Sequence, residues 1–196
     1  MANYGRFSGR PKTEWIDDTG ADRAMRLIED FWYEDPKGRR WLAPKTSIIN
    51  GASIPESLWF IVGTPYTGGY RRASVVHDVA CMTASILRED ADTMFYWACL
   101  AGGCSFLHAK LLYAGVRIGA YAFPVETLAP IRESVPADDA FSFGARRFPL
   151  ELRVETNKDR REIAKYEELA DELNKTDDDF ESIKETVDRM LINPHR

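Results

Sequence analysis

The sequence predicts an α+β fold, in which a small N-terminal β-hairpin or sheet packs on a core of three helices and a charged helical extension follows. Apolar residues alternate with charged ones before residue 44, recur at helical spacing between residues 70 and 122, and form narrow stripes in a charge-rich region after residue 155. The chain has 196 residues, 44% of them hydrophobic, which is enough for one domain with a core and an appendage.

Composition divides the chain into four segments. Residues 1–22 are polar and rich in Gly, Pro and Asp, which predicts an extended N-terminal arm. Residues 23–123 carry the sustained apolar periodicity and form the predicted core domain. Residues 124–154 are proline-containing and aperiodic, which predicts an irregular wrapping segment, and residues 155–196 form a charged helical tail.

A β-hairpin is the first element expected in the core domain. Its apolar residues alternate with charged ones and are Met25, Leu27, Phe31 and Tyr33. The turn sequence Asp35-Pro36-Lys37-Gly38 then precedes a second apolar run over residues 40–43. One face of this hairpin needs a helical layer to cover it.

Three helices are expected next, over residues 70–84, 88–101 and 105–122, and the second ends at Gly102-Gly103. A loop that leads into a short helix precedes them, with Ser53 as its N-cap. In the tail, residues 158–173 and 179–191 predict two further helices separated by a capping break at residues 176–179. Their apolar stripes dock either on a partner or on the chain's own domain.

Charge and hydropathy exclude several function classes. The formal charge of −5 and the pI near 5.3 predict no nucleic-acid footprint, because phosphate binding relies on clustered Lys and Arg. The longest apolar run, residues 111–123, is interrupted by Arg117 and predicts no membrane span. Because the N-terminus lacks the apolar run of a signal peptide, we expect residence in a cytoplasm. Three cysteines without an export signal are expected to be buried thiols.

The ionisable pair His77-Asp78 lies within an otherwise apolar helix and requires an explanation. Burying an unpaired polar or charged group costs several kcal/mol, so such a pair is either satisfied by partners or kept for chemistry. A short loop makes the next helix antiparallel, which brings Asp92 opposite His77. A carboxylate there orients the imidazole and stabilises its protonated form, as a general base requires. Asp78 faces other neighbours, where it binds a cation or holds a loop.

Several separated motifs in the right order resemble a phage-associated domain family of unknown function. Its pattern runs Thr-Asp-x-Ala-Ser-Ile-Pro, a Trp, His-Asp-x-x-Tyr, and then an Asp and a Phe about a dozen residues later. The matching residues here, within residues 40–122, are Asn50-Gly51-Ala52-Ser53-Ile54-Pro55, Trp59, His77-Asp78, Asp92 and Phe95. The resemblance implies a phage or prophage origin without implying a reaction. Asn50 replaces the Asp of the pattern and Cys81 replaces its Tyr, which weakens any site that used those groups.

A shorter resemblance, over residues 77–95, is to the secretory phospholipases. It implies that His77 is a general base, Asp78 a calcium ligand and Asp92 the orienting acid, but the sequence lacks their cysteine pairs and glycine-rich calcium loop. Spacing alone offers a different metal site. His77 and Cys81 are separated by one helical turn, and so are Cys104 and His108, so the four could form a tetrahedral zinc site. A divalent metal ion is thus the one cofactor that the sequence suggests.

Two hypotheses of function follow. The first is a phage or prophage virion-assembly or interaction protein whose cluster of His77, Asp78 and Asp92, supported by the loop residues Asn50 and Ser53, is mainly structural. It would contact other phage proteins, or a second copy of itself, through the N-terminal arm and the C-terminal helices. It would reside in the host bacterial cytoplasm or within the virion. The second is a hydrolase of ester or amide bonds, with or without a metal, that uses His77 as general base and Asp92 to orient it.

Overall fold

The computed structural model describes residues 3–16, 24–51, 54, 58, 68–122 and 157–192. Two three-stranded antiparallel sheets precede the helices, and the predicted α+β class is confirmed. One sheet has the strand order β1 (Arg6–Phe7), β4 (Phe31–Glu34), β5 (Arg40–Ala43). The other has the order β2 (Thr13–Trp15), β3 (Met25–Leu27), β6 (Ile48–Ile49). The predicted short helix near Ser53 and the wrapping segment 124–154 lie outside the described residues.

Strands β4 and β5 form the predicted hairpin, with Tyr33 opposite Trp41. The Asp35 carboxylate closes its turn by accepting the backbone N–H groups of Lys37 at 2.9 Å and Arg39 at 3.0 Å. Alternation buries one face, so that Phe31, Tyr33, Trp41 and Ala43 point into the core while their neighbours along the strands do not. Met25–Leu27 differs from the prediction, because it joins the second sheet instead of extending the hairpin.

The N-terminal segment also differs from the predicted arm. Strand β1 pairs with β4 and β2 pairs with β3, so part of residues 1–22 belongs to the two sheets. The Tyr33 hydroxyl donates a hydrogen bond to the Tyr4 carbonyl and fixes the chain there. Strands of two and three residues are too short to show alternation in the sequence, which explains why the composition alone indicated an arm.

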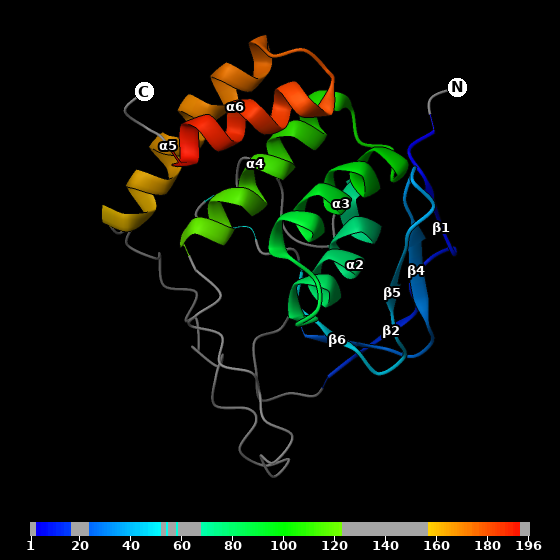
Figure 1. The fold of residues 1–196 in the computed structure, drawn as a ribbon. Coiled ribbons are helices and arrows are strands. Elements are labelled where there is room, and N and C mark those ends of the chain that lie inside the picture. The colour runs from blue at the N-terminus through cyan, green and yellow to red at the C-terminus, as the bar shows by residue number, and fades with distance from the viewer. Residues whose placement is uncertain are drawn as a thin grey trace.

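The helices appear where the periodicity predicted them. They are η2 (Gly68–Tyr70), α2 (Arg71–Met82), α3 (Arg88–Ala101), α4 (Phe106–Ala122), α5 (Asn157–Lys175) and α6 (Phe180–Ile192). Helix α2 lies between the strands and α3, and α3 lies between α2 and α4 (Figure 1). Because α2 has neighbours on several sides, residues 73–80 are buried without interruption, His77 and Asp78 among them.

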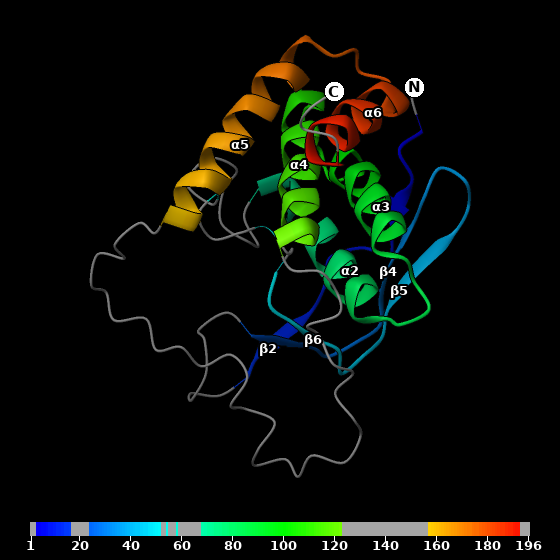
Figure 2. The ribbon, with the colours of Figure 1, turned by 60° about the vertical axis from the view of Figure 1, so that its left-hand side comes forward.

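The tail packs on its own domain. Helices α5 and α6 contact α4 and each other, on the side of α4 away from the sheets (Figures 1 and 2). The predicted apolar stripes provide the contact, since Tyr166, Leu169, Leu173, Ile183 and Val187 are fully buried. Asp179 caps α6, as the predicted break required, by accepting the Ser182 backbone N–H at 2.9 Å. These stripes are therefore covered by the chain itself.

Candidate functional site

Asp92 is the centre of the candidate site. Its Oδ1 atom accepts a hydrogen bond from Nε2 of His77 at 2.8 Å, and both side chains are 0% exposed. His77 comes from the middle of α2 and Asp92 from the second turn of α3. The short connection between these two antiparallel helices brings the residues together, as the sequence predicted. The ring of Phe95, with its centroid 4.7 Å from that of His77, covers the imidazole.

Two arginines complete the surroundings of Asp92. Arg88, one turn earlier on α3, donates from Nε to Oδ1 at 2.9 Å. Arg117 of α4 approaches Oδ2 with one guanidinium nitrogen at 3.5 Å and binds Asp188 of α6 with another at 3.0 Å. The charged cluster therefore consists of His77, Arg88, Asp92, Arg117 and Asp188, and it links α2, α3, α4 and α6. Neither arginine was among the predicted site residues.

The sequence did contain signals for both arginines. Arg88 precedes Asp92 by four residues, which is the spacing of an ion pair on one helix face. Arg117 is the one charge in the apolar run of α4, where burial demands a partner. The sequence offered no indication of the partner of Arg117, because Asp188 is 71 residues away along the chain.

The cluster holds His77 in its protonated form. Burial alone would lower the pKa of His77, but the neighbouring Cys81 and the hydrogen bond to Asp92 outweigh it and raise the pKa to about 9. Burial would likewise raise the pKa of Asp92, and the contacts with His77 and Arg88 lower it instead. At neutral pH the pair is thus an imidazolium and a carboxylate. A general base must be unprotonated and reachable by water, and this geometry provides neither.

Asp78 has a separate structural task. Its Oδ2 atom accepts the backbone N–H groups of Asn50 and Gly51, both at 2.7 Å, and so ties the chain after β6 to α2. Gly51 has a φ of 103°, a left-handed conformation that favours glycine. Because Asn50 contributes its backbone to this contact, the change from Asp to Asn at this position leaves the contact intact. Ser53, the other predicted loop residue, lies outside the described residues.

The structure does not bring together the four residues of the predicted zinc site. Cys104 lies beside Gly69 and accepts a hydrogen bond from the thiol of Cys99 that lowers the pKa of Cys104, and the ring of His108 packs on Tyr70 at 5.7 Å. Tyr70 precedes His77 by about 10 Å of helix, at 1.5 Å per residue, so the two pairs are far apart. A smaller set remains, because the ligand atoms of His77, Cys81 and Asp92 lie within 4.8 Å of one another. Arg88 and Arg117 lie beside that set, and their positive charges oppose a dication there.

Cys81 is the remaining reactive group near His77. Its Sγ atom lies 3.5 Å from Nε2 and 3.8 Å from Nδ1 of the imidazole. In a Cys-His-Asp triad, the thiol and the carboxylate engage opposite ring nitrogens. Here the thiol lies closer to Nε2, the nitrogen that already binds Asp92, so the three residues are not arranged as a triad.

These pKa directions predict a stability maximum at mildly acidic pH. Because folding raises the pKa of His77 from 6.5 to about 9, its contribution is complete below pH 6.5 and is lost as the pH rises through 9. The pKa of Asp92 is lowered from 3.8, so its contribution is present above that pH and is lost as the pH falls through the folded value. The free energy of unfolding should therefore be greatest between about pH 4 and 6.5. The alkaline loss should be about 3 kcal/mol, measured by urea unfolding at pH 6 and pH 10.

The matched control is His77→Gln, which keeps a polar side chain but does not titrate. Its alkaline loss should be smaller than that of the unmodified chain by the His77 contribution. An equal alkaline loss in both proteins would assign the pH dependence to other groups and remove the charged imidazolium from the cluster.

Residues 25–116 match the model of a family described as "Protein of unknown function (DUF1353)". His77, Asp78, Arg88 and Asp92 lie within this match, whereas Arg117 and Asp188 lie beyond it. The expectation that the chain resembles a domain family of unknown function is confirmed. No solved structure matches the chain. None of the helices in the described residues has the length and apolarity that a membrane crossing requires.

Two curated relatives come from Sinorhizobium fredii (strain NBRC 101917 / NGR234). "Uncharacterized protein y4jT" is 37% identical over 113 residues, which cover 58% of this chain and 33% of that protein. "Uncharacterized protein y4iH" is 37% identical over 107 residues, which cover 54% of this chain and 43% of that protein. The chain thus matches less than half the length of these relatives.

Proposed function

We propose that this chain is an interaction or assembly component of a phage or prophage particle, and that its hydrolase-like cluster is structural. The complete burial of His77 and Asp92 carries the structural part of the proposal. The Asp92 carboxylate accepts from the His77 imidazolium and from two arginines, and this network stabilises the junction of four helices. The phage setting rests on the motif resemblance, whose positions His77, Asp92 and Phe95 meet at this junction.

Particles provide the direct test. In virions purified after prophage induction from the strain that encodes the chain, we expect quantitative mass spectrometry to find it at a fixed ratio to a capsid protein. The purified chain should show no turnover of p-nitrophenyl acetate or of alanine p-nitroanilide. Presence in the lysate but not in purified particles would contradict the assembly role.

Hydrolysis of an ester or amide bond is the second candidate, and Cys81 is the observation that favours it. This half-buried thiol lies beside an imidazole that is itself bonded to a carboxylate, which is the set of groups that activates a cysteine nucleophile. A modest rotation of the Cys81 side chain or the His77 ring would be needed to place thiol and carboxylate on opposite nitrogens.

The second candidate makes a distinct expectation. Turnover of either chromogenic substrate should be abolished in both Cys81→Ala and His77→Gln. Cys104→Ala should keep the turnover, because Cys104 lies beside Gly69, before the start of α2 and far from Cys81. Turnover that survives in both of the first two variants would come from a contaminant and would remove the hydrolase from consideration.

A further inference from the structure

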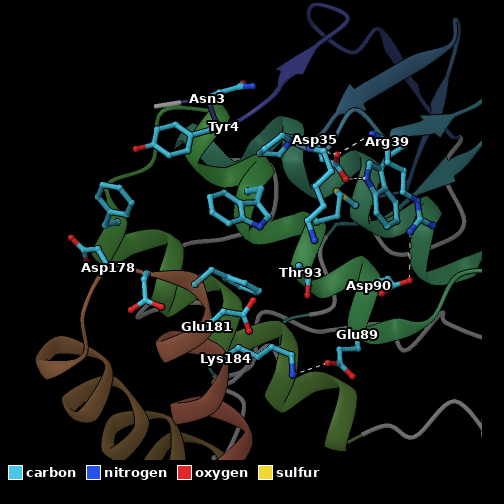
Figure 3. A pocket seen from close by; sticks show the side chains of 18 residues that line it. Asn3, Tyr4, Asp35, Arg39, Glu89, Asp90, Thr93, Asp178, Glu181 and Lys184 are labelled. Carbon is cyan, nitrogen blue, oxygen red and sulfur yellow. Dashed lines mark hydrogen bonds and ion pairs between the residues drawn. The ribbon is translucent and has the colours of Figure 1, made fainter. Parts of the chain in front are cut away.

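A cavity of about 850 Å³ lies between the β4–β5 turn, α3 and the start of α6 (Figure 3). It adjoins the charged cluster, because its lining residue Lys184 binds Asp188 at 2.9 Å. This volume falls within the range of about 300 to 1,000 Å³ that is typical of ligand sites. The Arg39–Asp90 and Lys184–Glu89 ion pairs lie at one end, and Tyr4 and Asp178 lie at the other (Figure 3).

Aromatic side chains form much of the lining of this cavity. They come from the N-terminal segment, β5, α3, α4 and α6, and they are Tyr4, Trp41, Trp97, Phe106 and Phe180. Several are in mutual contact, with the Trp97 ring stacked 6.4 Å from Tyr4 and tilted 5.6 Å from Phe180. Tyr4 and Phe180 lie outside the segment that matches the family, so the cavity is built jointly by that domain and by the flanking parts of this chain.

Carboxylates dominate the charge of the cavity. Six acidic residues line it, namely Asp35, Glu89, Asp90, Asp178, Asp179 and Glu181, against three basic ones. Glu89, Asp90 and Asp178 form ion pairs with Lys184, Arg39 and Lys110. Glu181 is exposed and, among the described residues, has no ion-pair partner. The excess negative charge favours a cationic occupant and opposes phosphate-bearing ones.

Arg39, itself a lining residue, shows how a guanidinium packs in this cavity. Its guanidinium carbon lies 3.9 Å from the centroid of the Trp41 ring, and one of its nitrogens lies 3.5 Å from Asp90. A planar guanidinium can stack on an indole while it pairs with a carboxylate, which the compact ammonium group of lysine does less well. Trp97 and Glu181 offer the same combination of a partly exposed indole and a carboxylate within the cavity.

A buried hydroxyl lies behind the aromatic wall of the cavity. Tyr96 is fully buried, packs on Trp97 and Phe180, and its hydroxyl has no hydrogen-bond partner among the described residues. Burial raises the pKa of Tyr96, and the nearby Asp178 of the cavity lining raises it further, so the hydroxyl stays protonated. A buried donor without a partner is uncommon in proteins, and this one lies behind the wall of the cavity and not in its lining.

From these features we infer that the cavity binds an arginine-bearing peptide segment of a partner protein. A guanidinium of the segment stacks on Trp97 and pairs with Glu181, and an apolar side chain packs against Phe180 and Phe106. The inference deepens the proposed role of the chain as an interaction protein and rests on it.

Fluorescence anisotropy with a labelled peptide tests this inference. The probe is fluorescein-Gly-Arg-Leu-Arg-Gly, compared with versions that carry lysine or uncharged citrulline in place of arginine. We expect saturable binding of the arginine peptide, at least about threefold weaker binding of the lysine peptide, and loss of binding with citrulline. Glu181→Gln should weaken binding of the arginine peptide about threefold to fivefold.

Glu185→Gln is the matched control, because Glu185 is also exposed on α6, one turn later, and does not line the cavity. It should leave the affinity unchanged. No saturable binding of the arginine peptide, or equal weakening by the two glutamine variants, would overturn the inference. The test is independent of the particle experiment, so peptide binding without virion incorporation would contradict the proposed function alone, and the converse would contradict this inference alone.

Discussion

Asp92→Asn should lower the free energy of unfolding by about 3 to 5 kcal/mol, a loss typical of removing one partner from a buried ion pair. The substitution keeps the shape of the side chain and removes the charge that three cations share. His77, Arg88 and Arg117 would then be positive and close together, with the side chains of His77 and Arg117 buried. Urea unfolding at pH 6, where the imidazole is protonated in the folded chain, measures the loss.

Asp90→Asn is the matched control for this experiment. It makes the same substitution two residues earlier in α3, where the side chain is 50% exposed and pairs with an equally exposed Arg39 at 3.5 Å. Exposed pairs contribute about 1 kcal/mol or less, so the control should change little. Similar effects of the two variants would mean that the charges around Asp92 are screened, and would contradict a sealed structural cluster.

The double variant Asp92→Asn/Arg117→Met tests how much of the Asp92→Asn loss comes from the uncompensated charge of Arg117. Methionine keeps much of the length of the arginine side chain without its charge, so it removes one of the cations that Asp92→Asn leaves uncompensated. The double variant should therefore be less destabilised than the sum of its two single variants. Additive effects would show that Arg117 and Asp92 act independently.

The contrast between the helices and the strands shows what a single sequence can reveal. Residues 71–82 and 88–101 are helical where the periodicity indicated, because an amphipathic repeat is recorded within one element. The pairing of Arg6 with Glu34 joins residues far apart, and no local pattern encodes it. The sequence therefore predicted the hairpin, whose strands are joined by a recognisable turn, and missed the strands that the N-terminal segment adds.

The candidate site likewise contains residues that the sequence could pair and residues that it could not. His77 and Asp92 could be paired from the sequence, because a short loop between two helices fixes their relation. Arg117 could be noticed as a charge in an apolar helix, yet its link to Asp188 depends on how the tail folds back over α4. Whether His77 serves chemistry or structure depends on burial, which is a property of the whole fold. The same is true of the cavity, whose lining comes from β5, α3, α4, α6 and the segments beside them.

Leu169→Ala should lower the free energy of unfolding by about 2 to 5 kcal/mol, as expected for a leucine truncated in a packed core. Leu169 lies on the stripe of α5 and is 0% exposed, although its helix belongs to the charged tail beyond the family match. A tail that docks only on a partner would leave this residue in water in the isolated chain, and its truncation would then cost little.

Leu107→Ala provides the comparison, because it makes the same substitution on a helix at a position that is 44% exposed. It should cost well under half of the Leu169→Ala effect, since most of its side chain remains in water in the folded chain. Equal small losses in the two variants, measured by urea unfolding of the purified chain, would place the tail away from its own domain. Unequal losses would mean that the tail is part of the folding unit, and that its apolar stripes are covered by its own domain in the isolated chain.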